Sequence, residues 1–411
     1  MQIAIVHPSL SVKGGAENVV VWLASGLVNY GHQVRVITST ADRKLFTAVP
    51  WNFETVELGG DGYRFDWSEM RKMARRLRPH LDGADLVNPH NFPANYWTYW
   101  ALPHGSARVA WYCQEPLRWL YTPPLDAHVQ RLRAIRGEVA PRSVRRLGYY
   151  LTKAHEMGYL RALREFDTRR RVKAIDHQVA NWYPLVMTNS VFVASQIRLL
   201  FGIDANVCRL GIPVGPAPEE KRPGTDSRIE LLMVTRLVVA KNVDTALRAM
   251  RALPEPVRSA VRLTVIGIGP DLPQLLRLRS ALGLEREVVF RGMVSDDELD
   301  RAYRTADALI YLTLDETFGL AYAEAAARAI PCIGPDHGGP VEFIDDGRTG
   351  LTVDALDPNA VAGAIVRLAS HPELRREMGR AARQKVEADY TVDAMVRRYL
   401  RLVESGLRKA A

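Results

Sequence analysis

Two glutamates, Glu316 and Glu324, flank a Phe-Gly pair in the stretch DETFGLAYAE. Gly319 is a poor helix-interior residue and an alanine-rich run follows it, so we expect a helix to begin at Gly319 or Leu320. Glu316 then precedes the helix, and the backbone amides of Phe318, Gly319 and Leu320 could bind a phosphate. Carboxylates accept hydrogen bonds from vicinal hydroxyls, which suits a sugar and a ribose. Taken alone, the stretch fits better an ordinary surface helix whose dipole favours nearby carboxylates.

Two cations, Arg236 and Lys241, follow an expected strand that ends at Thr235. Open α/β sheets bind ligands at the carboxyl ends of their strands. Arg offers a planar fork of donors and Lys a mobile point charge, so the pair is suited to a diphosphate. A solvated loop is the alternative interpretation of the same residues.

Glycines also follow two expected strands. Gly14 and Gly15 open a helix after the first strand, where a ligand could approach the backbone. The loop lacks the spacing of a dinucleotide-binding or P-loop motif, so a plain turn is an equal alternative. Gly267, in Gly-Ile-Gly-Pro, is weaker support for a site. His90 lies near another strand end and could contact a ligand, although a lone histidine is more often structural.

Short apolar strands alternate with helical segments in both halves of the 411-residue chain, which predicts two doubly wound α/β domains with parallel sheets. A Pro- and Gly-rich stretch at 213–227 marks the break between them. We expect domains at 1–214 and 215–390, with a final helical segment at 391–411 that packs back on the first domain. In the second half, strands are expected at 229–235, 261–267, 287–292, 308–313 and 330–334.

Basic charge is concentrated in one segment. Residues 131–173 contain 13 Lys/Arg and four Asp/Glu, a surplus equal to the net charge of +9 for the whole chain. This segment lies in an expected helical insert at about 117–175. Such charge favours anionic partners, including an anionic membrane surface. Nucleic acid is not expected, because no recognisable binding motif accompanies the charge.

The three cysteines are far apart, and no Cys or His spacing indicates a metal site. The first apolar run is too short for a signal peptide, and no run approaches the length of a membrane span. A cytoplasmic protein is therefore expected, placed at the inner membrane face if the basic insert binds lipid.

Together these motifs resemble the retaining glycosyltransferases of family four, which have the GT-B fold of two Rossmann-like domains around a central cleft. The resemblance covers most of the chain. It is carried by TRLVVAKNVDTAL, VIGIGP, FRGMVSDDEL, ETFGLAYAEAAA and GGPVEFIDDGRTG, and the Glu-x7-Glu spacing of Glu316 and Glu324 is the hallmark of that family. The opening stretch IAIVHPSLSVKGGAENVV is similar to mannosyltransferase-type members.

The resemblance implies a role for each of these residues. Arg236 and Lys241 would neutralise the donor diphosphate in place of a metal ion, so neither metal nor cofactor is expected. Glu316 would hold hydroxyls of the donor sugar, and Glu324 would hold the ribose. The remaining donor contacts would be Gly14, Gly15 and Gly267 near the diphosphate, Met293 and Val294 beside the base, and the amides of Phe318, Gly319 and Leu320.

One position departs from the family. Many members have a histidine that contacts the transferred sugar after the strand that ends here in Trp-Tyr-Cys, and this chain has Gln114. Glutamine can hydrogen-bond a hydroxyl, but it cannot exchange a proton at neutral pH. Its neighbour Glu115 and His90 are the candidates for contact with sugar or acceptor.

The function implied is transfer of a hexose, with mannose preferred, from a GDP- or UDP-linked sugar. The acceptor, held by the first domain, would be a glycan such as a growing polysaccharide, a glycolipid or a small molecule. The configuration would be retained, by reaction on the front face of the sugar. The alternatives are a nucleotide-sugar epimerase or phosphorylase on the same fold, and a catalytically weak homologue that acts as a partner.

Overall fold

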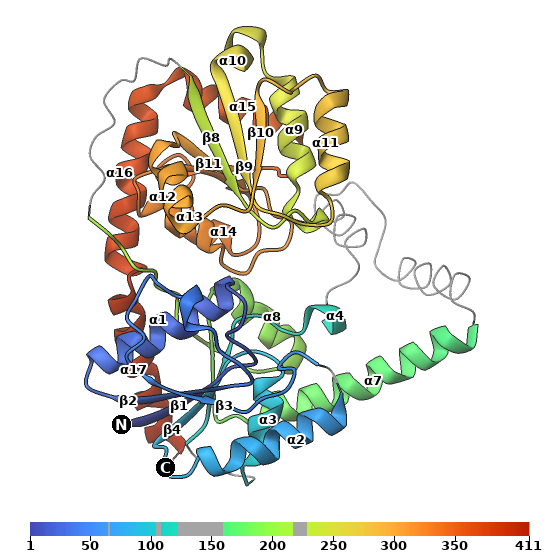
Figure 1. Ribbon diagram of the computed structural model, residues 1–411, viewed down its shortest axis with the longest axis vertical. Helices are drawn as coiled ribbons and strands as arrows, with labels where there is room; N and C mark the ends of the chain where they lie inside the picture. The colour runs from blue at the N-terminus through green and yellow to red at the C-terminus, as the bar shows by residue number, and fades with distance from the viewer. Residues whose placement is uncertain (65, 104–107, 122–158, 217–227, 411) are drawn as a thin grey trace. The chain divides into compact units, whose positions relative to one another are not determined.

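The structure is a computed structural model that describes residues 1–64, 66–103, 108–121, 159–216 and 228–410 (Figure 1). It divides into two compact units. The first unit contains Met1–Thr188, Val193–Val207 and Arg401–Ala411, and the second contains Asn189–Phe192 and Cys208–Leu400. The chain thus changes unit at 207/208, where the sequence suggested 214/215. The last helix, α17 (Val392–Ala410), continues into the first unit from Arg401.

The first unit is built on parallel strands in the order β3-β2-β1-β4, with a second group in the order β5-β6-β7. Single bridges between Val87 and Val109 and between His90 and Tyr112 connect β4 to β5. The strands are β1 (Gln2–Val6), β2 (Gln33–Thr38), β3 (Glu54–Glu57), β4 (Leu86–Pro89), β5 (Ala110–Cys113), β6 (Leu185–Thr188) and β7 (Asn206–Val207). The helices are α1 (Gly15–Asn29), α2 (Trp67–Leu77), α3 (Ala94–Ala101), α4 (Arg118–Tyr121), α7 (Tyr159–Trp182) and α8 (Val191–Phe201), with short 3-10 turns η1 (Arg43–Leu45) and η2 (Arg78–His80).

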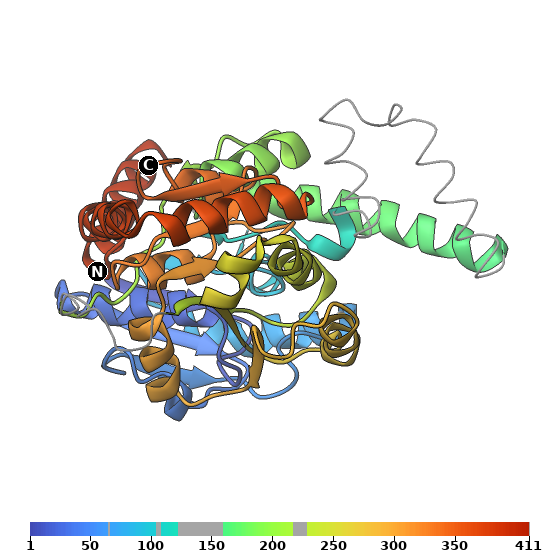
Figure 2. The ribbon, with the colours of Figure 1, turned by 90° about the horizontal axis from the view of Figure 1, so that it is seen from above.

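The second unit has one parallel sheet in the order β10-β9-β8-β11-β12-β13. Its strands are β8 (Ile229–Val234), β9 (Val261–Ile266), β10 (Val288–Gly292), β11 (Ala308–Ile310), β12 (Cys332–Pro335) and β13 (Gly350–Val353). The helices are α9 (Val243–Ala252), α10 (Glu255–Ala260), α11 (Leu272–Ala281), α12 (Asp296–Thr305), α13 (Leu320–Ala326), α14 (Pro340–Phe343), α15 (Pro358–Ser370) and α16 (Pro372–Asp389), with the 3-10 turn η3 (Val239–Lys241). Helices flank the strands of each unit (Figure 2).

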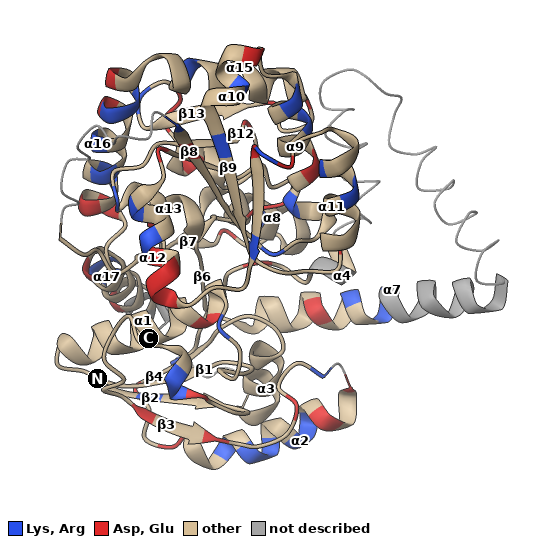
Figure 3. Ribbon diagram, turned by 45° about the horizontal axis from the view of Figure 1, so that its top comes forward, with Lys and Arg blue, Asp and Glu red and all other residues tan. Residues whose placement is uncertain are grey.

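The sequence explains why these elements form. The strands nearest the middle of each sheet are apolar because helices cover both of their faces, as in β1, where every residue after Gln2 is buried. Helix α12 begins with a capping box in which Ser295 and Glu298 exchange hydrogen bonds. The acidic residues that follow Ser295 in its first turn, red in Figure 3, favour the helix dipole.

The expected insert at 117–175 is described only at its two ends. Residues 122–158 lie outside the described residues, and the basic segment 131–173 therefore enters the structure only where α7 begins at Tyr159. In the ranges that the structure describes, no helix is both long enough and apolar enough to cross a bilayer.

Candidate functional site

The carboxyl ends of β8 and β11 bring two predicted residues of the second unit, Lys241 and Glu316, together. These strands are paired neighbours in a parallel sheet, so the loops that follow them lie at the same edge. The buried side chain of Asn242 ties the two loops together by donating to the carbonyl of Leu312, which follows β11, at 3.1 Å. Lys241 Nζ consequently donates to Glu316 Oε2 at 2.8 Å, although the two residues are 75 positions apart in sequence.

This pair is only partly accessible to solvent. The side chains of Lys241 and Glu316 are 18% and 13% exposed. Tyr311 adds a second hydrogen bond, donated by its hydroxyl to Glu316 Oε2 at 3.1 Å. Burial lowers the pKa of Lys241, but Tyr311 and Glu316 outweigh it, so that pKa lies above its usual value. Lys241 is therefore a cation throughout the neutral range.

The Tyr311 hydroxyl remains protonated as well. Burial and the Glu316 carboxylate raise the pKa of Tyr311 to about 12, against a smaller opposing effect of Lys241. The tyrosine can therefore donate to the carboxylate at any physiological pH. At this edge the Tyr311 hydroxyl and the Lys241 cation therefore both donate to one oxygen of the Glu316 carboxylate.

Gly319 directs the chain from this loop into α13. It has a φ of 85°, a left-handed conformation that favours glycine, and a Cβ there would lie 2.4 Å from the ring of Tyr322. The helix begins at Leu320, as the sequence predicts. The Phe318 side chain is buried, 5.7 Å from the ring of Tyr390, so this side chain belongs to the core.

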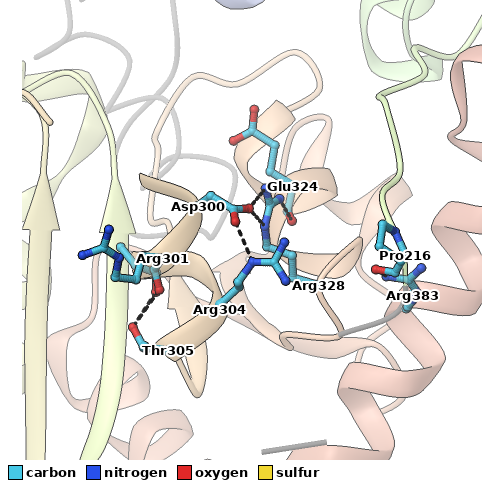
Figure 4. A network of polar contacts seen from close by, with 9 residues as sticks. Pro216, Asp300, Arg301, Arg304, Thr305, Glu324, Arg328 and Arg383 are labelled. Carbon is cyan, nitrogen blue, oxygen red and sulfur yellow. Dashed lines mark hydrogen bonds and ion pairs between the residues drawn. The ribbon is translucent and has the colours of Figure 1, made fainter. Parts of the chain in front are cut away.

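Glu324 lies one turn further along α13 and has a polar environment of its own. The hydroxyl of Tyr303, from α12, donates to Glu324 Oε2 at 2.8 Å. Arg328 donates to the Glu324 carbonyl at 3.0 Å and forms an ion pair with Asp300 at 2.6 Å. Figure 4 shows Arg328 joined to both Asp300 and Glu324. Neither Tyr303 nor Tyr311 was singled out in the sequence, because both look like ordinary core aromatics.

The other predicted residues of the second unit follow strand ends at the same edge of the sheet. Arg236 is exposed, as is Met293 at 72%, and Val294 is half-buried. Gly267 has a structural reason to be glycine, since a Cβ there would lie 1.9 Å from the Thr235 carbonyl oxygen. Across the described ranges, no group of three His, Cys, Asp or Glu side chains is placed to hold a metal ion.

In the first unit, Gln114 follows β5 as expected and is only 6% exposed. Its backbone N–H donates to Asn91 Oδ1 at 3.0 Å, and its side-chain amide donates to the Ala16 carbonyl at 3.5 Å. The glutamine therefore reaches the start of α1, immediately beside Gly14 and Gly15. Its neighbour Glu115 is half-buried.

His90 is fully buried in this unit. Its ring stacks on Tyr112 with centroids 4.8 Å apart, and its Nε2 donates to Asn88 Oδ1 at 3.0 Å. Burial, with a smaller effect of His7, holds the pKa of His90 well below its usual value. His7, at the end of β1, is also buried and has a lowered pKa for the same principal reason. No motif in the sequence distinguishes His7.

Glu17, in the first turn of α1, is another residue near the predicted site that the sequence did not reveal. The Glu17 carboxylate lies so close to Gly14 that a Cβ on that glycine would be 2.4 Å from Glu17 Oε2. Tyr63 donates to the other carboxylate oxygen at 2.5 Å. The start of α1 is thus covered by a carboxylate of its own first turn.

Both halves of the chain match protein-family models. Residues 218–385 match the model for glycosyl transferases group 1, and residues 13–213 match the model for glycosyltransferase family 4.

Among curated proteins, the chain is 33% identical over 217 residues to D-inositol 3-phosphate glycosyltransferase of Acidothermus cellulolyticus, covering 48% of each. It is 29% identical over 184 residues to N-acetyl-alpha-D-glucosaminyl L-malate synthase of Bacillus anthracis, covering 45% of this chain and 47% of that protein. The chain thus spans about half the length of these relatives. A GDP-mannose-dependent alpha-(1-6)-phosphatidylinositol monomannoside mannosyltransferase of Mycolicibacterium smegmatis is 29% identical over 267 residues, or 61% of this chain and 68% of that protein.

Solved structures match along the whole chain. A glycosyltransferase of Rickettsia africae has a TM-score of 0.70 at 16% identity, over 99% of this chain and 98% of the other. Sucrose-phosphate synthase of Thermosynechococcus elongatus has a TM-score of 0.70 at 18% identity, over the full length of both. The HepE protein of Anabaena, in complex with UDP and glucose, has a TM-score of 0.69 at 14% identity, over 98% of this chain and 100% of the other. At these identities the likeness concerns the fold, and it confirms the predicted GT-B class with two Rossmann-like domains.

Proposed function

We propose that this chain, which belongs to the group 1 glycosyltransferases, moves a hexose from a nucleoside-diphosphate sugar to a hydroxyl group of an acceptor. The observation that carries the proposal is the contact of Lys241 with Glu316 at the carboxyl edge of the second sheet. A cation for the departing diphosphate and a carboxylate for the sugar hydroxyls there lie within one hydrogen bond of each other.

The diphosphate is the more demanding part of the donor. As the bond from the sugar C1 to the diphosphate oxygen breaks, negative charge accumulates on that oxygen and needs a preorganised positive partner. Lys241, kept charged by its surroundings, and the exposed Arg236 supply this partner. They perform the neutralising role that a divalent ion has in other transferases, which makes the proposed reaction independent of a metal ion.

Glu316 and Glu324 receive the two ends of the donor. Glu316, outside the helix, accepts hydrogen bonds from sugar hydroxyls, and Glu324, inside it, accepts them from the ribose. The acceptor oxygen forms the new bond to C1 on the face from which the diphosphate departs, and its proton passes to the diphosphate oxygen. The configuration at C1 is thereby retained.

Two donors are supported to different degrees. The relative from Mycolicibacterium smegmatis is named for its dependence on GDP-mannose. The structure of HepE from Anabaena was solved with UDP and glucose. We take GDP-mannose as the first donor to test and UDP-glucose as the second. The acceptor is a glycan, a lipid-linked sugar or a small molecule, bound by the first unit. The basic segment 131–173 would place the enzyme at the cytoplasmic face of an anionic membrane.

Gln114 keeps a second candidate open, a weakly active homologue that binds a partner. The Gln114 side-chain amide donates to the Ala16 carbonyl, and Gln114 occupies the position at which the family resemblance implies a histidine. If Gln114 makes a weaker contact with the transferred sugar than a histidine would, donor hydrolysis will be slow while donor affinity is kept. An epimerase or a phosphorylase would be recognised by its product, which is an altered nucleotide sugar or a sugar phosphate.

The experiment is a donor screen followed by product analysis. Thermal unfolding is recorded with GDP-, UDP-, TDP- and ADP-sugars, and release of nucleoside diphosphate from the best ligand is measured with and without EDTA. We expect one nucleotide sugar to raise the melting temperature, and turnover to survive EDTA. A chain that neither binds nor cleaves any of the four classes would contradict the proposal, and turnover abolished by EDTA would contradict metal independence.

A further inference from the structure

We propose that two tyrosines, Tyr311 and Tyr303, are positioning residues that hold the two donor-binding carboxylates separately, one for each end of the donor. The inference rests on the proposed function and deepens it. Each tyrosine hydroxyl donates to one glutamate, Tyr311 to Glu316 and Tyr303 to Glu324. The two hydrogen bonds come from different elements, so each carboxylate can be disturbed without the other.

Tyr311 is fixed before it reaches the carboxylate. It directly follows β11, is 7% exposed, and accepts a hydrogen bond on its carbonyl from the Tyr322 hydroxyl at 2.5 Å. The two rings meet edge to face with centroids 5.1 Å apart. Because the sheet and Tyr322 fix this ring, its hydroxyl marks a fixed point to which Glu316 Oε2 is held.

Tyr303 is fixed by a different set of contacts. It lies on α12, is 1% exposed, and has the Arg328 guanidinium 5.0 Å from its ring centroid. Asp300, one turn earlier on α12, accepts two hydrogen bonds from Arg328, which in turn donates to the Glu324 carbonyl (Figure 4). These contacts tie both the backbone and the carboxylate of Glu324 to α12.

A tyrosine donor leaves a carboxylate able to bind substrate. A carboxylate has two oxygens and about four acceptor positions, so one tyrosine hydroxyl still allows the same group to accept from vicinal hydroxyls. What the tyrosine contributes is orientation, since a side chain already held in its bound rotamer loses less entropy when the ligand arrives. Removing the hydroxyl should therefore weaken chiefly the binding of the part of the donor that its own carboxylate contacts.

The test compares Tyr311→Phe with Tyr303→Phe, each serving as the control of the other. Affinity is measured by calorimetry for the nucleoside diphosphate alone and for the complete nucleotide sugar. Tyr390→Phe is the matched outside control, because its hydroxyl donates to the Glu342 carbonyl at 3.4 Å and contacts neither carboxylate. Each substitution keeps the aromatic ring, and thermal unfolding without ligand reports whether the fold is kept.

We expect Tyr303→Phe to weaken both ligands by about tenfold, the size of one hydrogen bond to a charged group. Because Tyr311 also neighbours Lys241, Tyr311→Phe should weaken the nucleoside diphosphate slightly, and less than Tyr303→Phe does; its main effect should be on the gain in affinity that the sugar adds, with a fall in kcat. With a 2′,3′-dideoxy nucleoside diphosphate, the loss caused by Tyr303→Phe should disappear, since no ribose hydroxyl is left for Glu324.

A double-mutant cycle separates this role from a general loss of packing. Tyr303→Phe should couple to Glu324→Gln in nucleotide affinity and should be additive with Glu316→Gln. The inference is overturned if the two tyrosine variants weaken both ligands alike. It is also overturned if the wild-type enzyme binds and turns over donor while both tyrosine variants behave as Tyr390→Phe does. A wild-type protein that binds no nucleotide sugar overturns the proposed function and this inference together.

Discussion

The carboxyl edges of the two sheets carry opposite kinds of chemistry. In the second unit the edge is charged, with Lys241 and Glu316 in contact and partly accessible to solvent. In the first unit the corresponding edge holds His90 and Gln114, both buried, and burial keeps the imidazole neutral by lowering its pKa. One α/β design therefore provides an ionic edge in one unit and a neutral, hydrogen-bonding edge in the other.

The two helix starts at these edges differ in the same way. Gly319 leads into α13 beside Glu316, which is paired with the cation Lys241. Gly14 leads into α1 beside the Glu17 carboxylate. A glycine before a helix can thus lie beside a negatively charged side chain. The charge of the neighbouring side chains decides what can approach the backbone.

The largest effect is expected at the ionic edge. Glu316→Ala should lower kcat by about 10²–10³-fold, as expected when a preorganised transition-state contact is lost. Turnover of the best donor, measured as released nucleoside diphosphate, reports this directly. Glu377→Ala, an exposed acidic residue on α16, is the control and should be neutral. Unchanged turnover in Glu316→Ala would mean that the carboxyl edge of the second unit's sheet takes no part in the reaction.

Loss of the cation should be the next largest effect. Lys241→Ala should raise the donor KM by about 10–100-fold, because the diphosphate loses a charge-assisted hydrogen bond. The matched variant Arg248→Ala removes an exposed cation from α9 and should leave KM unchanged. Equal effects of the two substitutions would mean that only the general positive field matters.

A smaller effect, of opposite sign, is expected in the first unit. Glu17→Gln removes the negative charge over Gly14 while leaving an acceptor for the Tyr63 hydroxyl. If Gly14 and Gly15 face the diphosphate, nucleotide affinity should increase about threefold to fivefold, the range of a charge near a helix N-terminus. Calorimetry at low salt measures it. A loss of affinity would mean that Glu17 itself contacts the donor.

The smallest effect concerns pH and stability. The pKa values of His90 and His7 are lowered in the folded protein, so the unfolded chain takes up protons more readily below about pH 6.5. Their contribution to the free energy of unfolding is complete above that pH and decreases as the pH falls toward the folded pKa values. The melting temperature should therefore fall between pH 7.5 and 5, and less steeply in His90→Gln. If the melting temperatures of the wild type and of His90→Gln fell equally with pH, His90 would not contribute to this pH dependence.

Much of the fold follows from the sequence, because parallel strands covered on both faces are continuous apolar runs. Strand β8 ends one residue before its expected end, and β9 does the same. The run 308–313 is strand only to Ile310, because the chain then leaves the sheet to form the site and Leu314 donates to the Ala240 carbonyl. The polar edge strand β3 and the charged helix α2 (blue in Figure 3) gave no apolar run to recognise.

The site was predictable only where strand order determines it. That Lys241 and Glu316 would lie at one edge follows from their positions after two strands of one parallel sheet. The hydroxyls of Tyr303 and Tyr311, by contrast, acquire partners only through tertiary packing, as does the Glu17 carboxylate above Gly14. For Gly267 the sequence suggested a ligand contact, and the structure supplies a reason within the fold, the close Thr235 carbonyl.

The central claim is that a nucleotide sugar binds at the ionic edge of the second unit. Hydrogen–deuterium exchange of the wild-type chain, with and without a saturating concentration of the best donor, tests it most directly. The account predicts protection of the amides in 235–243 and 315–324. Donor binding that protects neither segment would contradict it.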